Sequence, residues 1–210
     1  MSPLLQKGIL IVFEGIDGSG KSTQLRLLAE TLEQQAYPVV TTREPTDGPF
    51  GRKLRALFSQ RDAMTPEMEL ELFLDDRRDH VERLLAPALA QGKIVLCDRY
   101  FLSTVAYQGA AGSDPQAILA LNDFAPIPDL ALIFCASPQT WTHRITSGRG
   151  EELNDFEQED NLSRVAALFD SLDLPYIKRI QADGTITEIQ KQVLAAVQDL
   201  LSCQFSGERS

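Results

Sequence analysis

Residues 8–22 read Gly8-Ile9-Leu10-Ile11-Val12-Phe13-Glu14-Gly15-Ile16-Asp17-Gly18-Ser19-Gly20-Lys21-Ser22, and this stretch decides the fold. Its first six residues form an apolar run rich in β-branched side chains, which predicts a strand buried on both faces. From residue 21 to residue 35 the apolar positions take helical spacing. The loop between them, residues 15–22, matches the pattern G-x-x-x-x-G-K-[ST] between a strand and a helix, so we predict a phosphate-binding loop.

The chemistry of this loop predicts that ATP binds there together with Mg²⁺. Glycines let backbone N–H groups approach phosphate oxygens, and the N-terminus of the following helix favours an anion. Lys21 adds a positive charge between the β- and γ-phosphates. Ser22 and Asp98, which ends a buried strand, are the expected Mg²⁺ ligands, with a helix-capping role as the alternative for Asp98. The predicted nucleotide-binding residues are Gly15, Ile16, Asp17, Gly18, Ser19, Gly20, Lys21, Ser22 and Thr23.

Outward from this stretch, predicted strands and helices alternate. Further apolar runs predict strands at residues 38–42, 94–97, 130–135 and 176–180. Predicted helices run from Pro66 to about Gln91, from Pro138, across residues 162–172 after a polar stretch at 146–160, and from Asp183-Gly184 to about Ser202. Alternation of this kind predicts an α/β fold of the P-loop NTPase type, with five parallel strands and helices on both faces. We expect one domain over residues 1–203, a disordered tail at 204–210, and the chemistry at the carboxyl ends of the strands, near Glu14, Arg43, Asp98 and Ser137.

Composition narrows the class of protein further. With 210 residues, 43% of them hydrophobic, the chain suits one compact domain. A net charge of −10 argues against a broad basic surface, so neither nucleic acid nor a membrane is an expected partner. The N-terminus predicts neither a signal peptide nor a membrane span. The cysteines, Cys97, Cys135 and Cys203, are widely spaced and are expected to be free and mostly buried, which suits a reducing cytoplasm; the isolated His80 and His143 receive no catalytic or metal-binding role.

Arginines outside the loop suggest a second phosphate group. A switch GTPase is not indicated, because the sequence contains no N-K-x-D motif and no D-x-x-G after the strand that ends at Asp98. In a net-acidic chain, converging arginines would form a phosphate clamp, whereas each one alone is more often a solvated surface charge. The arginines concerned are Arg43, Arg55, Arg77, Arg99, Arg144 and Arg149.

Several motifs in one order resemble the thymidylate kinase family. They are Phe13 to Thr23, Thr42-Arg43-Glu44-Pro45, Phe73 with Arg77, Asp98-Arg99-Tyr100, and Ser103 to Gly109 with its Tyr107-Gln108-Gly109 end. The resemblance extends over about residues 9–189. It implies a nucleoside monophosphate kinase fold, transfer of a phosphoryl group from ATP to dTMP, and a homodimer. A kinase for another nucleotide or deoxynucleoside is the alternative, and a non-catalytic nucleotide-binding regulatory protein is a more remote one.

The same resemblance implies roles in the acceptor site. Phe73 would stack on thymine, Arg77 and Gln108 would meet the base edge, and Thr104 would lie beside it. Arg99 and Arg43, supported by Arg55, would bind the acceptor phosphate, and Asp17 would reach the sugar and its arginine partner. Tyr107 would crowd the sugar 2′ position, and Glu44 and Ser103 belong to the same site. The structural alternatives are a core aromatic for Phe73 and a half-buried helix tyrosine for Tyr107.

Family members carry an extra catalytic arginine either in the phosphate loop or in a mobile lid. Here the loop has no basic residue besides Lys21, whereas a lid segment at about residues 143–157 carries Arg144 and Arg149. The chain therefore resembles the bacterial kind with lid arginines. Arg149 is the first choice for neutralising charge during transfer and Arg144 the second. The predicted catalytic set is Lys21, Arg149, Arg144, Arg99 and Asp17.

Overall fold

The computed structural model describes residues 7–58, 65–149 and 156–206, with side chains throughout except at 146–149, 156–159 and 203–206. Within these ranges five parallel strands form one sheet in the order β2-β3-β1-β4-β5. The strands are β1 (Ile9–Glu14), β2 (Val39–Arg43), β3 (Ile94–Asp98), β4 (Leu130–Cys135) and β5 (Ile177–Gln181). The predicted five-stranded parallel sheet is confirmed, and each strand begins and ends within one residue of its predicted bounds.

The helices in the described ranges are α1 (Lys21–Gln34), α2 (Pro49–Phe58), α3 (Pro66–His80), α4 (Ala86–Ala90), α5 (Phe101–Ala110), α6 (Pro115–Leu121), α7 (Pro138–Arg149), α8 (Phe156–Ser171) and α9 (Ile186–Ser206). No bounds were predicted for α2, α5 and α6, although a helix was one interpretation of Tyr107. In α5 every residue from Phe101 to Ala106 is buried, so no polar face marks a helical period. Only seven residues form α6, and α2 buries only Gly51 and Leu54.

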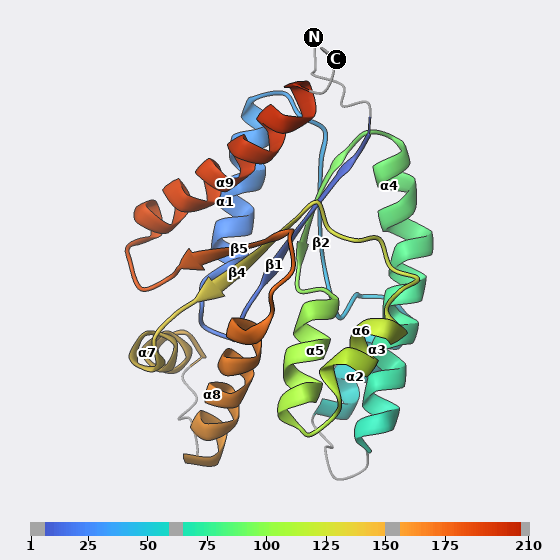
Figure 1. The fold of residues 1–210 in the computed structure, drawn as a ribbon, viewed down its shortest axis with the longest axis vertical. Helices are drawn as coiled ribbons and strands as arrows, with labels where there is room; N and C mark the ends of the chain where they lie inside the picture. Colours follow the sequence, from blue (N-terminus) through green and yellow to red (C-terminus); the bar gives the residue numbers. More distant parts are fainter. Residues whose placement is uncertain (1–6, 59–64, 150–155, 207–210) are drawn as a thin grey trace.

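The sheet separates two apolar layers, because alternate residues of each strand point to opposite faces. Ile9, Ile11 and Phe13 of β1 pack against α1 and α9, whereas Leu10 and Val12 face the opposite layer. Figure 1 shows α1 and α9 on one side of the sheet and α3, α4, α5 and α8 on the other. All six residues of β1 are buried, as predicted for a central strand.

The predicted helix from residue 66 to 91 is one helical path with a wider turn inside it. Thr65 caps its start by accepting a hydrogen bond from the backbone N–H of Met68 at 3.3 Å, and Pro66 takes the first helical position. A π-helical segment at Val81–Leu85 lies between α3 and α4. Pro87, which has no backbone N–H to donate, follows this segment after Ala86.

Two sequence expectations about helix ends were wrong. The polar stretch at 146–160 is partly helical, since α7 continues to Arg149 and α8 begins at Phe156. Glu and Gln are good helix formers, so polarity alone did not indicate a loop. Residues 204–206 of the tail expected at 204–210 are helical, because α9 continues to Ser206, and residues 207–210 lie outside the described residues.

The carboxyl ends of the strands meet at one edge of the sheet, as predicted. Asp98 of β3 pairs in register with Phe13 of β1 and with Arg43 of β2. Within the described ranges no helix combines the length and the apolar character that crossing a membrane requires.

We predict that Leu32→Ala destabilises the fold, although Leu32 lies away from the edge of the sheet where the carboxyl ends of the strands meet. Leu32 is 2% exposed in the α1–α9 layer, so its truncation leaves a cavity and should lower the free energy of unfolding by about 2–5 kcal/mol. Glu33→Ala, at an exposed position of the same helix, should change it by less than about 0.5 kcal/mol. Denaturant unfolding measures both values, and equal effects of the two variants would contradict this view of the core.

Candidate active site

Two glycines allow the phosphate loop to turn between β1 and α1. Gly15 has a φ of 132° and Gly20 a φ of 97°, a region that residues with a side chain rarely adopt. A Cβ at Gly15 would also lie 2.8 Å from the carbonyl oxygen of Phe134 in β4. The loop therefore packs against the neighbouring strand while its backbone remains turned toward the edge of the sheet. Ile16 and Ser19 are buried in it.

Lys21, the first residue of α1, folds back over the loop. Its ammonium nitrogen Nζ donates hydrogen bonds to the carbonyl oxygen of Ile16 at 2.7 Å and to Ser19 Oγ at 3.5 Å. Burial, and then the nearby positive charge of Arg99, lower the pKa of Lys21 to about 7. The protonated form of Lys21 is therefore destabilised in this site. The negative charge of a phosphate ligand would stabilise it.

Glu14, at the end of β1, is a buried carboxylate that the sequence placed at this edge without a role. It accepts hydrogen bonds from the backbone N–H of Tyr100 at 3.0 Å and from Ser103 Oγ at 2.5 Å. Burial raises the pKa of Glu14 to about 7, while the hydrogen bond from Ser103 acts in the opposite direction. Its place directly after the apolar run at residues 8–13 is the sequence signal that could have identified it.

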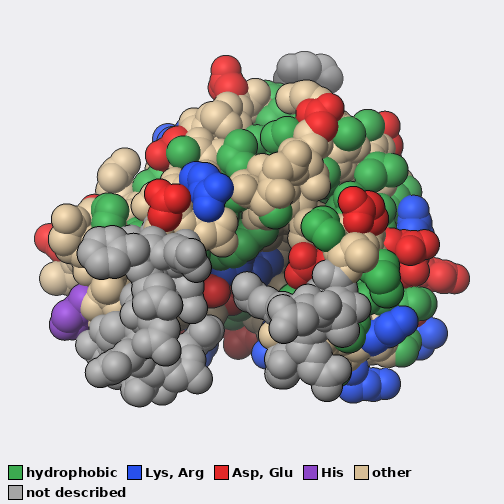
Figure 2. Space-filling view, turned by 90° about the horizontal axis from the view of Figure 1, so that it is seen from below, with side chains coloured by type: hydrophobic (Ala, Val, Ile, Leu, Met, Phe, Trp, Pro, Cys, Tyr) green, Lys and Arg blue, Asp and Glu red, His purple; other side chains and the backbone are tan. Residues whose placement is uncertain are grey.

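Ser22 and Asp98, the two predicted Mg²⁺ ligands, are in direct contact. The Ser22 hydroxyl donates a hydrogen bond to Asp98 Oδ2. Both line a hollow of about 440 Å³ that also reaches Arg43 and Asp47. Figure 2 looks at this end of the molecule from below and shows basic and acidic side chains together in its central hollow.

These two oxygen donors fit Mg²⁺, which is held by few protein ligands and keeps water and phosphate oxygens as the others. Among the described residues no cluster of three or more His, Cys, Asp or Glu side chains could hold a metal ion. The donor set therefore suits an ion that arrives with a nucleotide.

Arg99 joins the phosphate loop to α5. Its Nη2 donates to Asp17 Oδ1 at 2.9 Å and to the Tyr107 hydroxyl at 3.2 Å, and its Nη1 donates to Ser103 Oγ at 3.0 Å. The guanidinium also lies over the Tyr107 ring, 5.1 Å from its centre. Four predicted site residues from three segments of the chain thus meet here.

Arg77 has one of the largest fully buried side chains among the described residues, with 1% of it exposed. Its Nε and Nη2 donate to Glu44 Oε2 at 2.9 and 2.6 Å, and Nη2 also donates to Thr104 Oγ1 at 3.1 Å. Its Nη1 donates to Asn122 Oδ1 at 2.5 Å, and the guanidinium lies over the Tyr100 ring. The sequence predicted Arg77, Glu44 and Thr104 but missed Asn122, which follows the short helix α6.

The two remaining predicted base contacts lie on α3 and α5. Phe73 is half-buried, and its ring centre lies 6.4 Å from that of Phe58. Gln108 donates through Nε2 to Glu69 Oε2 at 2.8 Å, whereas its buried Oε1 has no hydrogen-bond partner among the described residues. Phe73 is therefore not enclosed as a core aromatic, and the Gln108 amide has a free acceptor.

Arg43 and Arg55 converge on one carboxylate. Both donate through Nη2 to Asp47 Oδ1 at 2.8 Å, and Arg55 also donates to the backbone carbonyls of Pro45 and Thr46. The Arg43 side chain is 61% exposed. The hydrogen bond from Arg43, and then its charge, lower the pKa of Asp47, which keeps this carboxylate ionised.

Arg144 of α7 lies above the phosphate loop. Its Nη1 donates to the Ser19 carbonyl and its Nη2 to the Gly184 carbonyl, both at 3.4 Å. The Arg149 side chain lies outside the described residues. Thr23, in the first turn of α1, is exposed.

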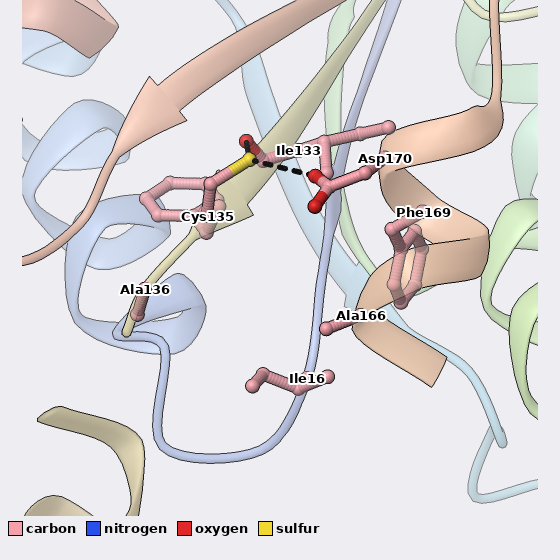
Figure 3. A pocket seen from close by; sticks show the side chains of 8 residues that line it. Ile16, Ile133, Cys135, Ala136, Ala166, Phe169 and Asp170 are labelled. Carbon is pink, nitrogen blue, oxygen red and sulfur yellow. Dashed lines mark hydrogen bonds between the residues drawn. The ribbon is translucent and has the colours of Figure 1, made fainter. Parts of the chain in front are cut away.

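Figure 3 shows a small cavity behind the loop, between Ile16, β4 and α8. Its volume of about 50 Å³ is far below the several hundred Å³ of a typical ligand site. Cys135 Sγ lies 3.8 Å from Asp170 Oδ1 there, and burial, followed by the Asp170 charge, raises the pKa of the thiol to about 11. Cys135 is thus a protonated thiol, Cys97 is buried and free, and Cys203 lies outside the described side chains.

Comparisons with known proteins agree with this geometry. The thymidylate kinase family model matches residues 13–193. A thymidylate kinase of Desulfotalea psychrophila is 51% identical over 194 residues, covering 92% of this chain and 96% of the relative. One of Xanthomonas campestris is 49% identical over 190 residues, covering 90% and 83%. A crystal structure of thymidylate kinase from Ehrlichia chaffeensis superposes with a TM-score of 0.67 at 32% identity, covering 91% of this chain and 99% of that one.

We predict that ATP binding takes up a proton at pH 8. With a pKa of about 7, Lys21 is mostly neutral at that pH, and nearby phosphates should raise its pKa back toward the ordinary 10.5. Calorimetric titration in two buffers with different ionisation enthalpies measures the uptake. Proton uptake should fall by about one proton per ATP in Lys21→Met. In Lys178→Met, which changes an exposed lysine as a control, the uptake should equal that of the unmodified chain. Equal heats in both buffers for the unmodified chain would refute the lowered pKa.

Proposed function

This chain belongs to the thymidylate kinase family, and we propose that its phosphate loop and its Arg77 and Arg99 clusters bind the two substrates of one transfer reaction. The activity is ATP-dependent phosphorylation of dTMP to dTDP. The observation that carries this assignment is the 2.9 Å ion pair between Arg99 and Asp17, because it ties the acceptor side to the loop that receives ATP.

The reaction is a direct in-line transfer. An oxygen of the dTMP phosphate forms a bond to the γ-phosphorus of ATP, the bond from that phosphorus to the bridging oxygen breaks, and ADP leaves. A general base is unnecessary, since the attacking oxygen is already anionic near neutral pH. Lys21 stabilises the dispersed charge, with Arg144 and Arg149 in support. When bound, Mg²⁺ would neutralise charge on the β- and γ-phosphates, and Ser22 and Asp98 would hold it.

The acceptor side divides into a phosphate end and a base end. Arg99 binds the acceptor phosphate, supported by Arg43 and Arg55, and Tyr107 limits the space beside the sugar. At the other end Phe73 stacks on thymine, while Arg77 and Gln108 meet its edge. The free Oε1 of Gln108 supports this arrangement, because a buried amide oxygen without a partner favours a ligand that donates a hydrogen bond. Glu44, Thr104 and Ser103 hold these groups in place.

We infer that the segment at about residues 143–157, of which residues 150–155 lie outside the described ranges, is a lid that excludes water during transfer, because water at the site would hydrolyse ATP. Family membership also supports a homodimer in the cytoplasm. Leu121, Phe124 and Ile127 are exposed large apolar side chains close together in sequence, and a surface of this kind suits contact with a second copy.

An acceptor panel tests the proposed function. Turnover with ATP and Mg²⁺ is measured for dTMP, dUMP, UMP, CMP, dGMP and thymidine, and dTMP should have the highest kcat/KM. Preference for thymidine would indicate a nucleoside kinase, and preference for another monophosphate would reject the proposed thymine contacts while leaving the phosphate loop assignment intact.

We predict that Lys21→Ala lowers kcat with dTMP at least about a hundredfold, because removing one preorganised electrostatic group from a transfer site typically costs about 3 kcal/mol or more. Lys178→Ala, which changes an exposed lysine of β5, should retain the kcat of the unmodified chain. Near-normal turnover of Lys21→Ala would reject the role of the loop lysine.

A further inference from the structure

Three alternate residues, Thr42 at the end of β2 and Glu44 and Thr46 just beyond it, form hydrogen bonds with one face of α3. Thr46 donates through its backbone N–H and its hydroxyl to Asp76 at 2.7 and 2.6 Å. Glu44 binds Arg77, and it also contacts His80, whose other ring nitrogen reaches Thr42. Asp76, Arg77 and His80 are each at most 4% exposed. Thr42, Glu44 and Thr46 together with Asp76, Arg77 and His80 therefore form a polar layer inside the protein, between the end of β2 and α3.

Hydrogen-bond chemistry fixes the protonation of the His80 ring at one nitrogen. Nδ1 lies 2.9 Å from Glu44 Oε1, and an ionised carboxylate only accepts hydrogen bonds, so Nδ1 carries a proton. Nε2 lies 2.8 Å from Thr42 Oγ1, a hydroxyl that can either donate or accept. Thr42 therefore tolerates either state of Nε2, whereas Glu44 requires the proton on Nδ1.

Both carboxylate oxygens of Glu44 are thus in use inside the protein. Oε2 takes two hydrogen bonds from Arg77 and Oε1 takes one from His80. Loss of the His80 donor would leave Oε1 buried without this partner, which favours rotation of the carboxylate toward another donor. Such a rotation would move the atom that orients the Arg77 guanidinium.

Hydrogen bonds to other described residues occupy all but one of the N–H groups of Arg77. A guanidinium has five N–H donors, and the hydrogen bonds to Glu44, Thr104 and Asn122 use four of them. The remaining N–H is on Nη1. Glu44 holds the Nε and Nη2 edge of the planar guanidinium, and this contact fixes the direction in which the Nη1 N–H points.

We propose that His80 is a positioning residue for the acceptor, acting through Glu44 to aim Arg77 at the base end of dTMP. This inference rests on the proposed function. A purely structural role for His80 would affect stability and both substrates alike. A positioning role affects the KM for dTMP and leaves the KM for ATP unchanged, because the ATP loop lies at the ends of other strands.

Two substitutions separate the two nitrogens of the ring. In His80→Asn the amide nitrogen takes the place of Nδ1 and can still donate to Glu44, whereas the contact with Thr42 is lost. In His80→Gln the longer side chain brings its amide near the place of Nε2, so that Thr42 is reached and the donor to Glu44 is lost. Both variants remove the ring, so they are matched controls for lost packing.

Steady-state kinetics then distinguish the roles. His80→Gln should raise the KM for dTMP about tenfold, the size expected from one lost hydrogen bond to a charged group. Its kcat and its KM for ATP should stay within about twofold of the unmodified chain. His80→Asn should keep the KM for dTMP within about twofold. Equal rises in both variants, no rise in either, or a parallel rise in the KM for ATP would overturn the positioning role.

Failure of the proposed function has a different result, namely no turnover of dTMP by the unmodified chain. If His80→Gln does not fold, ¹⁵N NMR of the unmodified chain decides instead. The sequence has two histidines, and the signals missing in His80→Asn belong to His80. A protonated Nδ1 supports the inference. A neutral ring with its proton on Nε2 overturns it, because Glu44 would then have no donor from His80.

Discussion

The complete burial of β1 is the constraint on which the rest of the structure depends. A strand with no exposed residue needs apolar cover on both faces and strands on both edges. Parallel neighbours on both edges in turn require helical crossovers, which provide that cover. Every strand then ends at the same side of the sheet. Glu14, Asp98 and the loop that begins at Gly15 therefore lie together for topological reasons, before any ligand is considered.

Buried charge is balanced differently in the two halves of the site. Around Lys21 positive charge is under-neutralised, since the fall in its pKa to about 7 follows from burial and from the positive charge of Arg99. Around Arg77 the charge is compensated within the protein, by Glu44, whose Oε2 accepts two hydrogen bonds from the guanidinium, and by two neutral acceptors. The first arrangement attracts a polyanion, and the second holds a donor in a fixed direction.

The sequence predicted what depends on local pattern and missed what depends on tertiary packing. Strand runs and the loop pattern are local, so the sheet, Lys21 and the contact between Ser22 and Asp98 followed directly. The roles of His80 and Asn122 depend on residues 36 and 45 positions away in the chain, Glu44 and Arg77. An isolated histidine carries no sign of a buried carboxylate partner. Helix α5 was missed for a related reason, because burial on nearly all sides removes the polar face that reveals a helix.

The polar layer between α3 and the end of β2 links fold to specificity. Replacing a buried ion pair by apolar residues of similar volume is often neutral or favourable for stability, because the pair gains little in exchange for its desolvation. What an apolar layer could not provide is a direction for the last Arg77 N–H. A base is recognised by one or two hydrogen bonds, and a donor that is free to rotate would accept several geometries. Glu44 fixes the orientation of Arg77 through the Nε and Nη2 edge of the guanidinium. This is a physical reason for the site to keep charges inside the protein.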